Sequence, residues 1–417
     1  MVDSVSAECS SIGIDTENHP HIAYCSGWLK YAQWNGIGWE LQLVDTIGHN
    51  RTAKLYLDDQ NAPHIAYFKD SCILKYAYYD GNSWQISKID SFKVASQYIL
   101  WSKYIDLKLF NGIPHISYSF INYNDSTRGI RYAFKSGDSW ITQTVWAENR
   151  IPTPFLLTTA IDLDQTNYPI IAFENYYPDP IDSGYLFCTR FNGQNWAIDT
   201  IERHWYSNYY VYSLKTDIYN RIHIYYQRLI ELFYAVKSSD TWTIEFVATN
   251  GWGECGGEMV LNEENPNVVY SSIRDPLTYA WKRDTMWYFE IIDSHYPGLY
   301  PSLAKDNEGG LHVSYTRFDD NCLLYAQRTP NAIEERVVSL KTEIPSVVYP
   351  NPAKAVMRVR CPSSVKEVKI FDVSGKLIKE IALPAGKNEF KISLKGINSG
   401  IYFLKVSNQT KKFLVVK

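Results

Sequence analysis

The feature that most constrains the fold is a five-residue segment, first seen as Pro20-His21-Ile22-Ala23-Tyr24, that recurs along most of the chain. Seven copies align, and they lie at residues 20–24, 63–67, 114–118, 169–173, 222–226, 266–270 and 311–315. All but one of the copies end in tyrosine, and five keep the histidine. Self-similarity at a regular period is the signature of repeat architectures, so we expect one supersecondary unit per copy.

The neighbours of each segment repeat as well. An aspartate stands six residues before the histidine position in five copies: Asp15, Asp58, Asp164, Asp217 and Asp306. An aromatic-small pair such as Tyr31-Ala32 follows each segment, and in six copies a tryptophan follows that pair: Trp39, Trp84, Trp140, Trp196, Trp242 and Trp287. The tryptophan spacing makes the repeat 45 to 56 residues long.

Each repeat contains four short runs rich in Ile, Val, Tyr and Trp, separated by turn residues such as Asn-Gly and Asp-Gly. Short strands at regular spacing indicate an all-β fold, and four strands at this period are typical of one β-propeller blade. We name strand A, which ends at the aspartate; B, the five-residue segment; C, which ends in the aromatic-small pair; and D, which starts at the tryptophan. The sequence thus predicts a seven-bladed β-propeller of four-stranded blades over residues 1–338.

Two segments are candidates for the last strand of the seventh blade, which lacks its tryptophan. Ile333 falls at the tryptophan position, so Ile333–Val338 is one candidate. The other is an N-terminal strand ending at Val2-Asp3, because Val44-Asp45 ends strand D in the first blade. Both alternatives stay open at this stage.

The repeated side chains have a structural interpretation. Identical His and Asp groups in successive blades are expected to satisfy one another's hydrogen bonds rather than to bind a metal, and the tryptophans are expected to pack between blades. We expect no cofactor, and nothing indicates a bound calcium. Seven cysteines lie far apart with no CxxC pair, which favours buried or idle thiols over zinc or thioredoxin-type chemistry.

Composition excludes several classes of protein. The formal net charge is −4 and the basic residues are spread along the chain, so we expect no nucleic-acid partner. No run of about 18 apolar residues predicts a transmembrane helix. The chain opens Met-Val-Asp-Ser with no basic segment and no apolar core, so no signal peptide is recognised. We hypothesise that the start of the chain is truncated.

The turns between strands C and D carry a family resemblance. Tyr79-Asp80-Gly81-Asn82-Ser83-Trp84 and Phe191-Asn192-Gly193-Gln194-Asn195-Trp196 resemble degenerate Asp boxes of sialidase-like propellers. The repeats also resemble propeller lectins of the fucose-binding type, which have similar Gly-x-x-Trp turns. In the sialidase-like family such boxes are structural, so the resemblance, over about residues 10 to 330, implies architecture rather than catalysis.

The C-terminal segment closely resembles the type A sorting domain of type IX secretion substrates. The motifs Tyr349-Pro350-Asn351-Pro352, Phe371-Asp372-Val373-Ser374-Gly375 and Ser399-Gly400-Ile401-Tyr402 carry the resemblance, and they occur in order before a basic end. Their key residues are Pro350, Asn351, Pro352, Asp372, Gly375, Gly400 and Tyr402. The resemblance implies the type IX secretion machinery as a partner and an extracellular or outer-membrane surface location.

From the residues alone, this C-terminal stretch reads as short alternating strands with Ser-Gly and Ala-Gly turns, which favours an immunoglobulin-like β-sandwich. A small adhesive β domain is the alternative. We assign residues 339–346 to a linker and residues 347–417 to the sorting domain.

Function is expected on one face of the propeller. The A–B and C–D turns share a face and are short and uniform, whereas the B–C and D–A loops share the other face and are long and different in every blade. Variable loops on a rigid scaffold favour recognition. The candidate ligand-binding residues are Trp101, Arg128, Tyr176, Tyr177, Asp182, Trp205, Tyr206, Arg228, Trp252, Arg274, Tyr296 and Arg317.

These residue types suit a glycan or a protein ligand, because aromatic rings stack on sugars and form the anchors of interfaces. Arg228, Arg274 and Arg317 each follow strand B in consecutive blades, so a sialidase-like glycoside hydrolase with an arginine clamp is the alternative. A structural surface protein without a small ligand is the third reading. We expect recognition rather than catalysis, and no catalytic residue is assigned.

Overall fold

The structure is a computed structural model of the whole chain. It describes residues 1–46, 52–70, 72–92, 105–122, 124–149, 157–177, 183–205, 208–249, 256–271, 275–294, 298–317, 320–329, 347–349, 353–360, 367–383, 389–406 and 409–416. The chain divides into two compact units, Met1–Val338 and Ser339–Lys417. Within the described residues every regular element is a strand, and no helix is long and apolar enough to cross a membrane.

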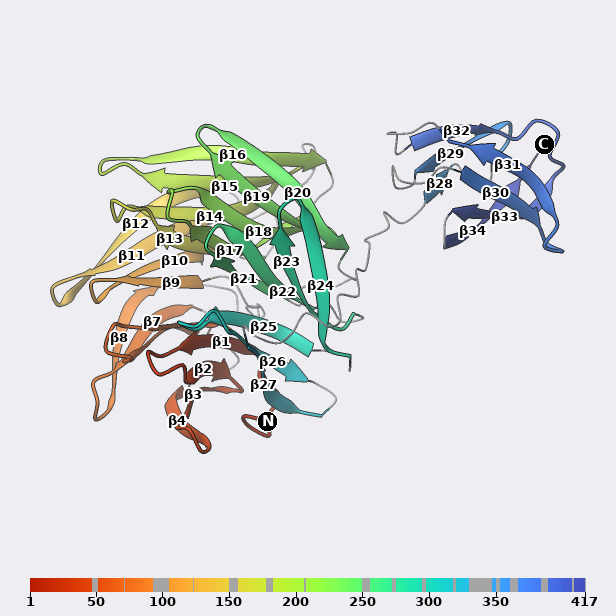
Figure 1. Cartoon of the computed structure of the whole chain (residues 1–417). Coiled ribbons are helices and arrows are strands. Elements are labelled where there is room, and N and C mark those ends of the chain that lie inside the picture. The colour runs from red at the N-terminus through yellow and green to blue at the C-terminus, as the bar shows by residue number, and fades with distance from the viewer. Residues whose placement is uncertain are drawn as a thin grey trace. The chain divides into compact units, whose positions relative to one another are not determined.

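The described residues of the first unit form seven antiparallel sheets, each made from strands consecutive in the chain (Figure 1). The first three sheets are β1 (Cys9–Ile14), β2 (Pro20–Cys25), β3 (Trp28–Trp34), β4 (Trp39–Thr46); β5 (Ala53–Leu57), β6 (Pro63–Lys69), β7 (Ile73–Tyr79), β8 (Trp84–Ser91); and β9 (Ile105–Phe110), β10 (Ile113–Asn122), β11 (Thr127–Ser136), β12 (Ser139–Glu148).

The next four sheets follow the same order, and the last of them has three strands. They are β13 (Thr159–Leu163), β14 (Pro169–Tyr177), β15 (Ser183–Phe191), β16 (Trp196–Trp205); β17 (Tyr209–Thr216), β18 (Ile222–Arg228), β19 (Glu231–Ser238), β20 (Thr241–Thr249); β21 (Gly257–Asn262), β22 (Asn265–Tyr270), β23 (Leu277–Arg283), β24 (Met286–Asp293); and β25 (Gly298–Lys305), β26 (Leu311–Arg317), β27 (Cys322–Arg328).

The sheets are arranged as the blades of a propeller. The first strand of every sheet contacts the first strands of the two neighbouring sheets, and β1 contacts β25, so these strands form a closed ring. Figure 1 shows β25 beside β1. The predicted all-β propeller of repeated four-stranded sheets is therefore confirmed. The count of seven complete blades stays a prediction, because the seventh sheet has three described strands and Ile333–Val338 lies outside the described residues.

The second strand of each sheet holds the repeated segment and forms the core. All six residues of β2, Pro20 to Cys25, are buried, and β6 and β18 are buried over six of their seven residues. Strands buried on both faces carry apolar residues without a polar alternation, which is what this segment shows. The core is therefore a ring of inter-sheet seams rather than one central cluster.

The repeated aspartate and histidine hold the A–B turn and the third strand together. In the first sheet, Asp15 Oδ1 accepts hydrogen bonds from the backbone N–H groups of Glu17 and His19, and Asp15 Oδ2 lies 3.2 Å from His21 Nε2. The carboxylate only accepts, so Nε2 carries the proton and His21 Nδ1 accepts from the Tyr31 hydroxyl. The same Asp–His–Tyr set recurs at Asp58–His64–Tyr76, Asp217–His223–Tyr234 and Asp306–His312–Tyr325. The predicted structural role of these groups is confirmed.

The repeated tryptophans form the seams between sheets, as predicted. The ring of Trp84 packs edge-on against Tyr31 of the preceding sheet with centroids 5.3 Å apart. Equivalent pairs are Trp140–Tyr76, Trp196–Tyr132 and Trp287–Tyr234. Trp39 of the first sheet packs in the same way against Tyr325 of the seventh sheet, 5.5 Å away. One aromatic pair thus joins the two ends of the ring.

The N-terminal segment supplies the missing edge of the seventh sheet. Val2 N–H donates to the Leu323 carbonyl, Leu323 N–H donates to the Asp3 carbonyl, and Asp3 pairs with Leu323. In the first sheet, Asp45 pairs with Leu29 in the same register. Of the two alternatives left open by the sequence, the N-terminal one is therefore present, while the other segment lies outside the described residues.

The cysteines give one correction. Cys9 and Cys25 face each other across β1 and β2, with Cα atoms 5.3 Å apart, and form a disulfide. The expectation of idle thiols was therefore wrong for this pair, because residues 16 apart in the chain meet across a hairpin. Cys72, Cys188 and Cys322 are free thiols.

The second unit has two antiparallel sheets around its own apolar core. One sheet comprises β28 (Val347–Tyr349), β29 (Val356–Arg360) and β32 (Glu389–Ser393), and the other comprises β31 (Leu377–Ala382), β30 (Glu367–Asp372), β33 (Gly400–Val406) and β34 (Gln409–Val415). The immunoglobulin-like assignment of this unit stays a prediction.

Candidate functional site

The innermost strands of the seven sheets surround a cavity of about 430 Å³. All seven strands contribute to its lining: β1, β5, β9, β13, β17, β21 and β25. The lining reaches Ile14, Leu57 and Lys305, the last residues of their strands before the A–B turns. The cavity therefore occupies the central channel on the side of the uniform A–B turns.

Two layers of equivalent positions run around the innermost strands, and all of their residues except Ala160 and Ser213 line the cavity. In the first layer, each residue pairs with the histidine position of the neighbouring second strand: Gly13, Tyr56, Lys108, Asp162, Lys215, Val260 and Ala304. In the second layer, each pairs with the fourth residue of the repeated segment: Ser11, Lys54, Asp106, Ala160, Ser213, Glu258 and Ser302. The residue type at these two positions of the first strand therefore varies between sheets, and several of the side chains are charged.

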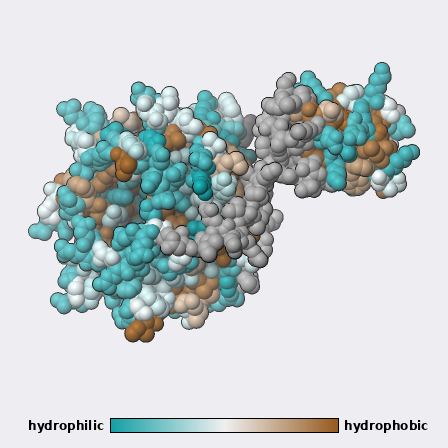
Figure 2. Space-filling view, viewed as in Figure 1, coloured by the Kyte–Doolittle hydropathy of each residue, from teal (hydrophilic) through white to brown (hydrophobic). Residues whose placement is uncertain are grey.

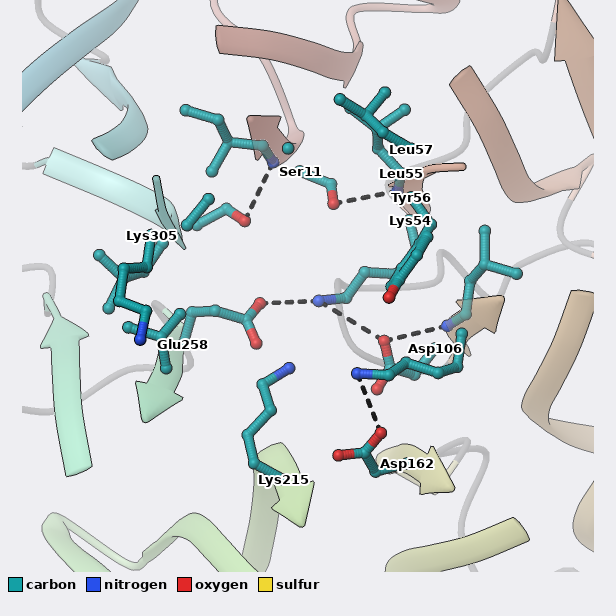
Figure 3. A pocket seen from close by; sticks show the side chains of 18 of the residues that line it. Ser11, Lys54, Leu55, Tyr56, Leu57, Asp106, Asp162, Lys215, Glu258 and Lys305 are labelled. Carbon is teal, nitrogen blue, oxygen red and sulfur yellow. Dashed lines mark hydrogen bonds and ion pairs between the residues drawn. The ribbon is translucent and has the colours of Figure 1, made fainter. Parts of the chain in front are cut away.

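Most charged groups of the cavity are paired (Figure 3). Lys54 Nζ lies 2.7 Å from Glu258 Oε2 and 3.7 Å from Asp106 Oδ1, and Lys108 Nζ lies 2.9 Å from Asp162 Oδ1. Burial opposes the charge of Lys54, but its two carboxylates outweigh this and hold its pKa above the usual value. Burial likewise opposes the charge of Lys108, and Asp162 is the main group that raises its pKa.

The carboxylates also bind the exposed backbone of the inner strands. Asp106 Oδ2 accepts from Ile161 N–H of the next sheet, and Asp162 Oδ2 accepts from Thr216 N–H of the sheet after that. Ser11 and Ser302 do the same for Leu55 and Ile12. Edge strands leave N–H groups without a ladder partner, so these side chains have a structural task beside their charge.

Lys215 differs from the other lysines of the cavity. Among the described residues its amino group has no ion pair and no hydrogen bond, whereas Lys305 Nζ donates to the Leu261 carbonyl at 2.8 Å. Figure 3 shows the Lys215 side chain directed into the cavity. Burial lowers the pKa of Lys215, and the nearby Lys108 ammonium lowers it further. This site could not be recognised from the sequence, because the lysines lie in strands that meet only when the ring closes.

The predicted recognition face is described in part. Trp101, Asp182, Tyr206, Trp252, Arg274 and Tyr296 lie outside the described residues, and of Tyr176 and Tyr177 only the backbone pairing with Gly184 and Ser183 is described. Arg128, Trp205, Arg228 and Arg317 remain. They lie at B–C or D–A ends of strands in the third, fourth, fifth and seventh sheets.

The three described arginines bind acids close to them. Arg128 is 2% exposed, and its guanidinium donates to Glu148 at 2.7 Å and to Asn175 at 2.6 Å. Arg228 pairs with Glu202 and Glu231, a pairing that raises its pKa against the opposing effect of burial. Arg317 pairs with Asp293 and Asp320. The described arginines therefore do not converge on one point, and Arg274 lies outside the described residues.

Of the aromatic residues predicted to bind the ligand, Trp205 is the one whose side chain the structure describes. It ends β16 and is 57% exposed. The Arg203 guanidinium lies 4.8 Å from the centre of its ring and 5.3 Å from that of Tyr185. Arg203 thus bridges the two rings on the D–A side of the fourth sheet. We call Tyr185, Arg203 and Trp205 the aromatic platform.

Other functional features of the sequence also have places in the structure. Among the described residues no group of three His, Cys, Asp or Glu side chains could hold a metal. In the second unit, Asp372 Oδ1 accepts from the N–H groups of Ser374 and Lys376, with Gly375 at φ 84° in the turn. The Tyr402 hydroxyl donates to the Asn398 carbonyl. Gly400 begins β33, and Pro350, Asn351 and Pro352 lie outside the described residues.

Comparison with known proteins identifies the second unit. Residues 347–417 match the family model described as the secretion system C-terminal sorting domain. This domain indicates export by the type IX secretion system, to the cell surface or the extracellular space. No curated protein matches the chain.

Solved structures resemble the first unit in fold. An ulvan lyase of a new polysaccharide lyase family, bound to -[GlcA(1-4)Rha3S]-, superposes with a TM-score of 0.54 at 11% identity, over 79% of this chain and 94% of that chain. A fucose-specific lectin from Aleuria aurantia gives 0.48 at 14% identity, over 69% and 96%. An α-L-arabinanase from Penicillium chrysogenum gives 0.46 at 10%, over 67% and 92%. The likeness to the ulvan lyase concerns the fold alone. The ring of repeated sheets and the sorting domain define the protein as an exported β-propeller.

Proposed function

We propose that the exported propeller recognises carbohydrate through its B–C and D–A loop face, with the aromatic platform as an anchor. The observation that carries the proposal is the 57% exposure of Trp205 at the end of β16, on the side of the variable loops. A large aromatic ring is normally buried, so one exposed beside a cation is a candidate contact surface.

The chemistry of the platform suits a sugar. A pyranose presents an apolar face that stacks on an aromatic ring, and its hydroxyl groups accept hydrogen bonds from a guanidinium. Arg203 holds the ring of Trp205 by a cation–π contact and keeps N–H donors on the same face. Figure 2 shows that the visible side of the first unit is largely hydrophilic, and such a surface favours a small polar ligand over a broad protein interface.

The described acids of this face favour binding over hydrolysis. Glu148 and Glu202 are each bonded to an arginine, and Glu174 Oε1 accepts from Thr158 N–H. A glycoside hydrolase needs one carboxyl group that protonates the leaving group and another that attacks or activates water. A glycoside hydrolase is therefore the second candidate function, and the experiment tests for its activity.

A glycan-array screen of the full chain tests the proposal, run beside fluorogenic glycosides as substrates. We expect selective glycan binding without turnover. Trp205→Ala should weaken binding about 5- to 150-fold, in line with the ~1–3 kcal/mol of a stacked ring. Tyr219→Ala, which removes a 67% exposed ring on the opposite A–B face, is the matched control and should leave binding unchanged.

Two results would contradict the proposal. Binding that survives Trp205→Ala would place the ligand elsewhere, and turnover of a glycoside would favour the hydrolase. If no glycan on the array binds and no glycoside is hydrolysed, a protein partner or a structural role remains.

A further inference from the structure

The central cavity carries an unbalanced charge. Its lining holds the four lysines Lys54, Lys108, Lys215 and Lys305, and the three carboxylates Asp106, Asp162 and Glu258. Each carboxylate is within ion-pair distance of Lys54 or Lys108. The seven side chains therefore carry one positive charge in excess, and two of the lysines, Lys215 and Lys305, lie outside these ion pairs. Lys305 donates to a backbone carbonyl.

Lys215 is the lysine of this set for which the described residues show no ion pair and no hydrogen bond. Its neighbours Glu258, Asp106 and Asp162 attract its charge, but burial and the adjacent Lys108 outweigh them. An ammonium group enclosed without a partner destabilises a fold by several kcal/mol unless something pairs with it. A site that keeps such a group beside an accessible cavity is a candidate binding site.

The cavity has room for a ligand. Its volume of about 430 Å³ falls within the range of about 300–1,000 Å³ that is usual for small-molecule sites. Lys54 and Lys108 keep 14% and 24% of their side chains accessible, so the cavity is not closed. Tyr56 adds an aromatic ring and Ser11 and Ser302 add hydroxyl groups to the wall.

We propose that the central cavity binds one anionic group, a carboxylate or a sulfate, on a ligand of about monosaccharide size, with Lys215 as its counter-ion. The anion pairs with the Lys215 ammonium and restores charge balance in the channel, while Lys54 and Lys108 keep their carboxylate partners. The site lies at the A–B end of the channel and is separate from the aromatic platform, so it stands or falls independently of the proposed function.

Calorimetric titration of the full chain at neutral pH tests the proposal with three probes: D-glucuronate, inorganic sulfate and D-glucose. We expect glucuronate to bind and glucose not to bind. Binding of sulfate as well would show that a free anion fills the site, and binding of glucuronate alone would show that the sugar ring is also recognised. Both results support an anion site.

Variants then locate the site. Lys215→Met should weaken glucuronate binding at least tenfold, yet raise the melting temperature by about 2 °C or more, because it removes a partly buried charge that has no ion-pair partner among the described residues. Lys215→Arg keeps the charge and should retain binding within about fivefold. Lys282→Met, which breaks the outer ion pair with Glu245, is the control and should leave binding unchanged.

The proposal fails if neither anion binds, if glucose binds as tightly as glucuronate, or if Lys215→Met leaves the affinity unchanged. Should Lys215→Met fail to fold, the wild-type chain and Lys215→Arg still decide the matter. Lysine side-chain NMR signals that move with glucuronate but not with glucose, and that differ between these two proteins at position 215, support the site. Unmoved signals overturn it.

Discussion

At the scale of single residues, neighbouring sheets are joined by pairs of side chains, and where one repeat replaces the tyrosine of a pair its partner differs as well. The Tyr67 hydroxyl donates to Asp45 of the preceding sheet at 2.8 Å, and the Tyr118 hydroxyl donates to Asp90 at 2.6 Å. In the fourth sheet the tyrosine becomes Phe173, and the residue that faces it is Trp146, with ring centroids 5.7 Å apart. A phenylalanine has no hydroxyl to donate, so an aromatic partner replaces the acid.

His115 lacks the aspartate partner that other histidines of the repeat have, and its pKa reflects this. It bonds to the Tyr132 hydroxyl at 2.5 Å, but Leu109 stands where five of the other repeats have aspartate. The shorter turn at Asn111-Gly112 explains the change, because both residues adopt positive φ and no aspartate is needed to hold the loop. Burial lowers the pKa of His115 to about 4.

Acid should therefore destabilise the propeller through His115. Its folded pKa lies below the unfolded value of 6.5, so the unfolded chain takes up the proton first as the pH falls. We expect the free energy of unfolding to drop by about 2–3 kcal/mol between pH 6.5 and 4 from this group. The free energy of unfolding, measured by chemical denaturation across that range, should change less with pH in His115→Gln than in His19→Gln, a control at a half-exposed histidine. Equal profiles, or an NMR pKa near 6.5, would contradict the account.

At the scale of elements, the sequence offers two candidates for the strand that closes the ring and does not decide between them. Val2-Asp3 repeats Val44-Asp45 of the first sheet, and this likeness extends to contacts. The Tyr24 hydroxyl donates to Asp3 Oδ2 at 2.7 Å, as Tyr67 does to Asp45. Lys30 adds an ion pair to Asp3 at 3.0 Å. The first and last sheets are thus joined by the same bond as other neighbouring sheets.

Breaking this closure should weaken the whole ring. Asp3→Ala leaves the buried Tyr24 hydroxyl without its acceptor, at a cost of about 1–3 kcal/mol. We expect the propeller transition in thermal or chemical unfolding to shift by that amount. Asp240→Ala, in an exposed turn between β19 and β20, should change stability by less than about 0.5 kcal/mol. An Asp3→Ala variant as stable as the wild type would show that the segment is not needed for closure.

The blades themselves could be predicted from the sequence because their determinants are local. A turn aspartate, a buried segment and a tryptophan recur within one repeat, and each contacts its own or an adjacent sheet. The Cys9–Cys25 pair was missed although it is also local, since cysteine spacing alone does not reveal which residues face each other across a hairpin. The predicted alternation of short and long loops remains the basis for the recognition face.

At the scale of the whole molecule, the central cavity could not be predicted. Lys54, Lys215 and Glu258 come from the second, fifth and sixth sheets, and they meet only because seven strands close a ring. Nothing in any one repeat marks these positions, whose residue type varies from copy to copy. The sorting domain is the opposite case, because its turns and strand motifs stand in one continuous stretch that both sequence and family comparison identify.

The two units divide the work of the protein. The C-terminal unit indicates export, and the propeller presents two candidate surfaces, the aromatic platform among the variable loops and the anionic-group cavity among the uniform turns. Exchange of loops alters the first without touching the ring, whereas a change of charge in the inner strands alters the second.

The most direct measurement is a crystal structure of the full chain with the glycan that binds best on the array. The account predicts a sugar ring stacked on Trp205 with a hydroxyl group bonded to Arg203. For an acidic glycan, a second copy is expected to place its anionic group at Lys215. Density for the glycan elsewhere, with a bare Trp205, would contradict the proposed recognition face.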